Sequence, residues 1–253
     1  MTGWSWIQLA LLGAAGLVGG FVNTLAGGGS LVTLPALLLL GLPADVANAT
    51  NRVGVLAQSV VAARGLARDS RLAAAAKARV LAPALAGALV GAWIAARTPP
   101  EALKPILLAT LVAIAFAMAW KPHLVVPGPG EVPLDPRERR FGVAGLFLIG
   151  AYGGFLQVGV GIVLLLFLGG VLRYDLLLGN ALKSLLVAAL TLVALAVFVL
   201  EGQVQWLPGL LMSVAMVVGA RLGVRYARTR GQDAIRKVLF VAVLASCVAA
   251  ALR

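Results

Sequence analysis

Cysteine, histidine and carboxylates are scarce in this sequence. Its 253 residues contain one cysteine, one histidine and nine Asp or Glu. The single cysteine, Cys247, excludes an internal disulfide and a cysteine-based metal cluster. The single histidine, His123, lies in a stretch rich in proline and charge, where we expect it to be solvated. We therefore expect no metal site, no cofactor and no catalytic residue.

The acidic residues fall at or near predicted loops, and none lies deep in an apolar segment. They are Asp45, Asp69, Glu101, Glu131, Asp135, Glu138, Asp175, Glu201 and Asp233. Sodium- and proton-coupled carriers commonly bury a carboxylate, so coupling here would need another group. An intramembrane protease would need two Asp, or a Ser beside a His or Lys. Ser184 does follow Lys183, but adjacent helix positions point apart, and we expect no enzyme activity.

Apolar residues dominate what is present. They make up 61% of the chain, and only 12% is charged, whereas soluble domains are about 25% charged. Ala, Leu and Gly prevail and strand-like alternation is absent, so we predict an all-α polytopic membrane protein rather than a barrel. The apolar segments are 4–26, 30–42, 44–64, 72–97 and 102–120, then 141–159, 161–172, 176–200, 205–226 and 234–252.

The net charge of +12 comes from 21 Lys and Arg that concentrate in short loops between the apolar segments. The positive-inside rule produces this placement, so we expect a lipid bilayer rather than nucleic acid as the partner. A small anionic substrate is a second, compatible reason for a positive excess. The sequence leaves open whether chains assemble into a homo-oligomer.

The two halves of the sequence are alike, which predicts an internal duplication. "NATNR" at 48–52 aligns with "NALKS" at 180–184, and "GGF" at 19–21 aligns with "GGF" at 153–155. The second alignment pairs Asn23 with Gln157 and Gly27 with Gly161. We divide the chain into a first transmembrane repeat (1–120), a linker (121–140) and a second transmembrane repeat (141–253).

Loop charge predicts that the two repeats have opposite orientations. The loop at 64–79 is strongly basic, and the corresponding loop of the second half, at 200–206, has no basic residue. The second-half loop at 221–237 is basic, and the corresponding first-half loop at 97–104 is weakly charged. Matching loops thus lie on opposite sides, as in the inverted-topology repeats of secondary transporters. We expect a multi-pass membrane protein with the linker on the cytoplasmic side and both termini on the external side.

A glycine-rich turn, "AGGGS" at 26–30, interrupts the apolar sequence. The apolar segment after it would span roughly 20 Å as a helix, short of a hydrocarbon core near 30 Å. We predict short broken or re-entrant helices after this turn and after its poorer counterpart "QVGVGIV" at 157–163. A helix N-terminus beside such a turn suits an anion. The alternative is that these glycines let helices pack closely, which we favour for the GxxxG pairs Gly87/Gly91 and Gly219/Gly223.

Polar side chains inside the apolar segments complete the candidate site. Arg52 and Lys183 lie at depth in predicted helices, where charges mark functional sites, although both could instead snorkel to an interface. The candidate substrate-binding residues are Asn23, Gly27, Gly28, Gly29, Ser30, Asn48, Thr50, Asn51, Arg52, Gln157, Gly159, Gly161, Asn180 and Lys183.

These motifs together resemble the TauE/SafE family of sulfite exporters and organosulfur-anion permeases. The resemblance rests on "GGFVNTLAGGGSLVTLPALLLLGLPADVANATNRVGVLAQS", "GGFLQVGVGIVLLLFL" and "LLLGNALKSLLVAALTLVALAVF", and it covers nearly the whole chain. It implies a bacterial inner-membrane transporter of small anions such as sulfite or sulfoacetate. Our ten segments give about eight full transmembrane helices if the two short ones are re-entrant.

We therefore expect a secondary transporter of sulfur oxyanions or organosulfonates that binds its substrate near the midplane between the repeats. The alternative is an anion channel, or a facilitator for other small organic acids. The sequence does not separate these functions, nor does it give the direction of transport or the coupling ion.

Overall fold

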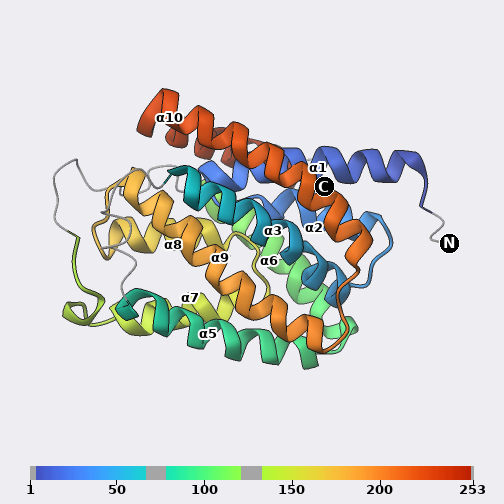
Figure 1. The fold of residues 1–253 in the computed structure, drawn as a ribbon, viewed down its shortest axis with the longest axis horizontal. Helices are drawn as coiled ribbons and strands as arrows, with labels where there is room; N and C mark the ends of the chain where they lie inside the picture. The colour runs from blue at the N-terminus through green and yellow to red at the C-terminus, as the bar shows by residue number, and fades with distance from the viewer. Residues whose placement is uncertain (1–3, 67–77, 121–132, 252–253) are drawn as a thin grey trace.

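The structure, a computed structural model, describes residues 4–66, 78–120 and 133–251 (Figure 1). In two helices the structure describes the backbone but not every side chain. The side chains of residues 115–120 and 230–251 are not described. Within these ranges the chain forms nine α-helices and one 3-10 helix, with no strand. The predicted all-α class is confirmed. His123, residues 67–77 of the basic loop and residues 121–132 of the linker lie outside this description, as does the side chain of Cys247.

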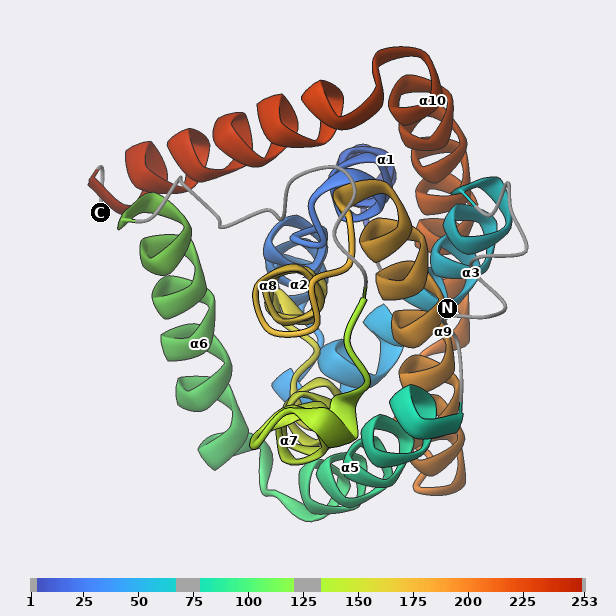
Figure 2. The ribbon, with the colours of Figure 1, turned by 90° about the vertical axis from the view of Figure 1, so that its left-hand side faces the viewer.

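The first half contains five helices and the second half four. The first five are α1 (Trp6–Leu25), α2 (Ser30–Leu39), α3 (Ala44–Leu66), α5 (Ala78–Arg97) and α6 (Pro100–Trp120). The 3-10 helix η1 (Pro136–Glu138) leads into α7 (Gly142–Phe155), α8 (Val160–Gly170), α9 (Leu176–Leu200) and α10 (Trp206–Ala251). Both segments predicted at 205–226 and 234–252 belong to α10, which bends sharply along its length, so that its C-terminal part runs across the end of the bundle to α6 (Figure 2).

Four stretches among the described residues are long and apolar enough to cross a membrane. They are α1, α5, α9 and the Trp206–Thr229 part of α10. The long helix α3 is not among them because polar residues occupy its middle. Those residues, Asn48 to Arg52, are fully buried within the protein, so other helices rather than lipid surround them.

The longer helices surround the two short ones. Figure 2 shows α2 and α8 near the middle of the end-on view, with α1, α7 and α9 around them. α3 and α9 contact each other, α1 packs along α10, and α5 packs along α7. A Cβ on Gly87 or Gly219 would come within about 2 Å of a carbonyl oxygen on the facing helix, of Phe147 or Leu17 respectively. The prediction that these glycines serve helix packing is confirmed.

Two helix breaks define the centre of the molecule. α1 ends at Leu25 and α2 begins at Ser30, while α7 ends at Phe155 and α8 begins at Val160. With 10 and 11 residues, α2 and α8 extend only about 15 Å each, half of a hydrocarbon core. The short helices predicted after the two turns are therefore present.

The backbone of the turns aligns the halves differently from the sequence. Gly27 and Gln157 each follow the end of a long helix in a left-handed conformation, with φ of 84° and 60°. Gly29 and Gly159 are the N-caps of α2 and α8. Gln157 thus corresponds to Gly27, and its predicted pairing with Asn23 is wrong. The second half has a longer path between this turn and the next long helix, so an ungapped alignment shifts the register.

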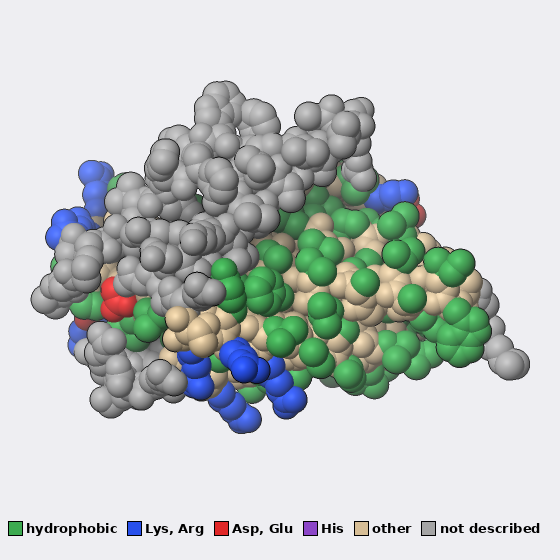
Figure 3. Space-filling model, turned by 90° about the horizontal axis from the view of Figure 1, so that it is seen from above, with side chains coloured by type: hydrophobic (Ala, Val, Ile, Leu, Met, Phe, Trp, Pro, Cys, Tyr) green, Lys and Arg blue, Asp and Glu red, His purple; other side chains and the backbone are tan. Residues whose placement is uncertain are grey.

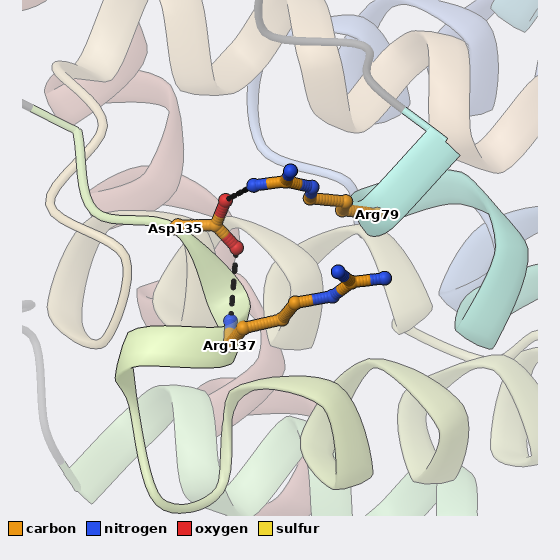
Figure 4. Close-up of polar contacts among 3 residues, drawn as sticks. All are labelled: Arg79, Asp135 and Arg137. Atoms are coloured by element: carbon orange, nitrogen blue, oxygen red, sulfur yellow. Dashed lines mark hydrogen bonds and ion pairs between the residues drawn. The ribbon is translucent and has the colours of Figure 1, made fainter.

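An ion pair anchors the start of the second half. Asp135 accepts hydrogen bonds from the Arg79 guanidinium and from the backbone N–H of Arg137 (Figure 4). The backbone hydrogen bond, followed by the Arg79 contact, lowers the pKa of Asp135 below its ordinary value. The contact ties η1 to the first turn of α5.

Candidate functional site

The broken end of α1 is capped by two side chains of α9. The Lys183 Nζ donates to the carbonyl oxygens of Asn23, at 2.9 Å, and Thr24, at 3.3 Å. The Asn180 Nδ2 donates to the same Thr24 oxygen at 3.0 Å. The last carbonyls of a helix have no intrahelical partner and carry partial negative charge, which suits a cation. α9 therefore satisfies the end of α1 inside the protein.

The broken end of α7 is capped in the same way by α3. The Arg52 guanidinium donates to the carbonyl oxygens of Gly153 (3.0 Å), Gly154 (2.6 Å) and Phe155 (3.3 Å). The Asn48 Nδ2 donates to the Phe155 oxygen at 2.8 Å. Each half of the chain thus supplies an asparagine and a cation to the broken helix of the other half.

An aromatic ring supports the arginine. The Arg52 Cζ lies 4.8 Å from the centroid of the Phe198 ring, which is fully buried in α9. A guanidinium over an aromatic face gains a cation–π attraction that is stronger away from water. This contact and the three carbonyls hold Arg52 in one position deep in the bundle.

The two breaks are in direct contact. A Cβ built on Gly27 would lie 2.3 Å from the Gly161 carbonyl carbon, and a Cβ on Gly161 would lie 2.6 Å from the Gly27 Cα. Only glycine fits at either position, because backbone meets backbone there. The expectation that two glycine turns from the two halves face each other is therefore met by this pair.

The start of α2 is held by asparagines from α1 and α3. The Asn23 Oδ1 accepts from the Gly29 N–H at 3.3 Å. The Asn51 Nδ2 donates to the Ser30 hydroxyl at 3.3 Å, and its Oδ1 accepts from the Thr33 hydroxyl at 2.7 Å. Asn23 thereby contacts both the Lys183 ammonium through its carbonyl and the start of α2 through its side chain.

Gln157 stands at the second break in a left-handed backbone conformation that costs a non-glycine residue roughly 1–2 kcal/mol. Its Nε2 donates to the Thr191 hydroxyl of α9. The neighbouring Val158 carbonyl accepts from the Tyr152 hydroxyl. Strain of this kind concentrates at functional sites, and here it aims an amide between α7 and α9.

Several buried polar atoms at these breaks have no hydrogen-bond partner among the described residues. They are the Asn48 Oδ1, the Arg52 Nε, the Gln157 Oε1 and the Asn180 Oδ1. A buried polar atom without a partner costs about 1–3 kcal/mol, so native structures rarely leave one unpaired unless water or a ligand completes it. Four such atoms at the two breaks are available to water or to a polar ligand.

The charge at the cluster is positive. Arg52 and Lys183 are 0% and 2% exposed, and no Asp or Glu is among the buried polar residues that the structure describes. No group of metal-binding side chains occurs in the described ranges either. Two buried cations without a described buried carboxylate make the cluster more suitable for an anion than for a cation.

The structure gathers most of the predicted residues and separates one. Asn23, Asn48, Arg52, Asn180 and Lys183 meet at the helix ends through the contacts above. Thr50 lies apart, because its hydroxyl accepts from the Gln205 N–H just before α10. The Gly28 carbonyl accepts the first backbone hydrogen bond of α2, from Leu31. The idea that Arg52 and Lys183 snorkel to an interface is wrong for this structure, since both are enclosed.

Four residues of the network were missing from the sequence-based set. Thr33 is hydrogen-bonded to Asn51, and Thr191 is hydrogen-bonded to Gln157. Tyr152 donates to a carbonyl at the second break, and Phe198 packs against Arg52. Helical spacing could have found Thr191, which lies on the same face of α9 as Asn180 and Ser184. Nothing in the sequence marks Phe198 among many apolar residues.

Comparison with known proteins places the chain in a family. The model of the family described as "Sulfite exporter TauE/SafE" matches residues 12–250. A "Probable membrane transporter protein ORF9" of Sinorhizobium is 31% identical over 242 residues, which cover 95% of this chain and 91% of that protein. A "Probable membrane transporter protein" of Haemophilus influenzae is 27% identical over 92% of this chain and 90% of that protein. The "Probable membrane transporter protein YfcA" of Escherichia coli K12 is 28% identical over 93% of this chain and 86% of that protein. No solved structure matches significantly. The chain is a member of the TauE/SafE family.

Proposed function

We propose that the protein is a secondary transporter of small anions, with the substrate bound where the broken ends of α1 and α7 meet. The observation that carries this proposal is the reciprocal capping, in which Lys183 of α9 contacts α1 and Arg52 of α3 contacts α7. Transporter sites commonly form at discontinuous helices between two halves of a chain. The relatives described as membrane transporters support the same assignment.

An anion fits the cluster better than a cation. The N-termini of α2 and α8, at Ser30 and Val160, begin beside the breaks and carry partial positive charge. Arg52 and Lys183 add two positive side chains without a buried carboxylate among the described residues. A cation would meet repulsion from all four groups.

Sulfur oxyanions and organosulfonates are the proposed substrate class. The description of the family as sulfite exporters supports this class. Three of the four unpartnered atoms are acceptors, on Asn48, Gln157 and Asn180. They favour an anion that brings a hydrogen of its own, as hydrogensulfite does, or one that carries a water molecule.

Two inverted-topology repeats are the proposed architecture. In two such repeats α1 corresponds to α7, and α5 corresponds to α10. The packing of α1 on α10 then corresponds to the packing of α7 on α5, and both are present. The capping of each break by the opposite half follows the same exchange. In this arrangement about eight helical segments span the inner membrane, with the two arms of α10 on either side of its bend counted separately, and α2 and α8 are re-entrant. The basic loops then place both termini in the periplasm and the linker 121–140 in the cytoplasm.

The burial of the cluster favours a carrier over a channel. Asn23, Arg52 and Lys183 are at most 7% exposed, so solvent does not reach the cluster from either side in this conformation. A carrier passes through such an occluded state, and it opens by moving one half against the other. An open channel would need a continuous polar path.

Uptake by purified protein in proteoliposomes tests the function. The panel contains sulfite, sulfoacetate, thiosulfate, acetate and chloride, each with and without a proton gradient. We expect saturable flux of the sulfur anions, with counterflow of labelled substrate. Flux that does not saturate would replace the carrier with the channel. Absence of flux for every anion would refute anion transport.

A further inference from the structure

A basic cleft lies between α3 and α10, outside the cluster at the helix breaks. It has a volume of about 390 Å³. Val61 and Gly65 of α3 line one side, and Arg221, Val224, Arg225 and Arg228 of α10 line the other. Figure 3 shows Lys and Arg side chains gathered toward one end of the molecule, beside a largely apolar surface.

The three arginines of the cleft share one face of α10, and none of them pairs with an acidic side chain that the structure describes. Their spacing of four and then three residues places Arg221, Arg225 and Arg228 on successive turns of one helix face. All three are exposed. The described residues contain ion pairs at Arg79–Asp135 and Arg97–Glu201 but none at this cleft. Three like charges side by side repel each other, and an anionic ligand would relieve that repulsion.

The floor of the cleft is apolar. A Cβ on Gly65 would lie 2.7 Å from Val224, so the missing side chain lets α3 and α10 touch there. Along α10 away from the cleft, Val214, Val218 and Leu222 are 70%, 41% and 47% exposed, as expected of a lipid-facing surface. The arginines therefore stand where an apolar, lipid-facing surface ends.

We propose that this cleft binds the phosphate of an anionic phospholipid, with the lipid's apolar part against Val224 and the exposed surface of α10. Basic pockets between transmembrane helices bind anionic headgroups through this combination of charge and apolar contact. A role in membrane orientation alone would account for the arginines but would need no cleft. The proposal does not depend on which anion is transported.

Binding of short-chain lipids to the delipidated full-length protein in detergent tests the proposal. The probes are dihexanoyl phosphatidylglycerol, dihexanoyl phosphatidylcholine and inorganic phosphate, each titrated and followed by native mass spectrometry. The test variant is R221Q/R225Q/R228Q. The control, R97Q/R137Q/R140Q, removes the same charge elsewhere. We expect phosphatidylglycerol to bind more tightly than the other two, and to lose about fivefold in affinity for each cleft arginine removed.

Two results would overturn the proposal. One is an equal loss of phosphatidylglycerol affinity in the test and control variants, since the effect would then come from net charge alone. The other is inorganic phosphate binding as tightly as the lipid, which would make the cleft a site for a soluble anion. If the triple variant does not fold, R225Q alone supplies the test, because Arg225 is exposed and its single replacement should cost about fivefold.

Discussion

Lys183, in the second half of the chain, donates a hydrogen bond of 2.9 Å to the carbonyl oxygen of Asn23, in the first half. The Asn23 side chain in turn accepts from the Gly29 N–H at the start of α2. Asn23 thus links Lys183 to both sides of the first helix break: its carbonyl lies at the end of α1, and its side chain bonds the start of α2. Arg52 has the corresponding position at the second break. An anion that entered between the breaks would compete for these two cations.

Replacing Lys183 with Met should abolish anion flux while the protein still folds. The substitution leaves the carbonyls of Asn23 and Thr24 with fewer donors, but it also removes the cost of a buried ammonium. We expect the free energy of unfolding to change by no more than about 2 kcal/mol. Flux in proteoliposomes should fall at least about 100-fold, the factor that corresponds to roughly 3 kcal/mol of lost binding.

The exposed Lys104 of α6 provides the control, since K104M removes the same charge from the surface. Normal flux in folded K183M would exclude Lys183 from the transport site.

Replacing Gly161 with Ala should impair both stability and transport, whereas Gly170→Ala in the same helix should do neither. The new Cβ at Gly161 would lie 2.6 Å from the Gly27 Cα, where backbone must move, and Gly170 has nothing within 4 Å. Overpacking of this kind costs about 1–3 kcal/mol. Thermal unfolding in detergent and flux measure the two effects. Equal behaviour of the two variants would mean that the contact between the breaks is unimportant.

Replacing Gln157 with Glu tests the sign of the charge that the site accepts. The side chains have nearly the same shape, and where the Gln157 amide donates to the Thr191 hydroxyl, a carboxylate would accept from that hydroxyl instead. A negative charge beside the breaks should lower anion flux at least about tenfold. Gln8→Glu, at the capping box of α1, adds the same charge far from the breaks and should leave flux unchanged. Undiminished flux in Q157E would place the anion elsewhere.

Replacing Asp135 with Asn should lower thermal stability at neutral pH but not in acid. The folded protein lowers the pKa of Asp135 below the ordinary value near 4, so its charged form stabilises the fold above that pH. This contribution disappears as the pH falls through the lowered pKa. Asn can still cap η1, so only the charge is lost. Melting curves should therefore separate wild type from D135N at pH 7, and the difference should shrink as the pH falls below the ordinary Asp value near 4. A difference that stays constant over this pH range would contradict this account.

Composition and segment length predicted the helical class and the two helix breaks. Glycine and proline mark the break before α2 clearly, since Gly27 occupies a left-handed position that favours glycine. The alignment of the halves failed at Gln157, because a glutamine in that position carries no local signal. That the last two apolar segments belong to one bent helix, α10, was also missed, since a polar stretch inside such a helix looks the same in sequence as a loop.

The polar residues of the site were found from their depth in apolar segments. Their partners could not be predicted, because Arg52 and Lys183 bond backbone carbonyls of the opposite half. The sequence alone does not show where those carbonyls lie in the fold. Thr50 was included by proximity to Asn51, although successive helix residues face different directions. Sequence thus singled out most of the polar residues at the two breaks, and only the structure gave their contacts.

The most direct test of an anion site at the two breaks is calorimetric titration of sulfite into purified wild-type and K183M protein. We predict a saturable heat for the wild type with one sulfite per chain, and at least about 100-fold weaker binding for K183M. Equal sulfite affinity in the two proteins would contradict the account, because the anion would then bind away from Lys183.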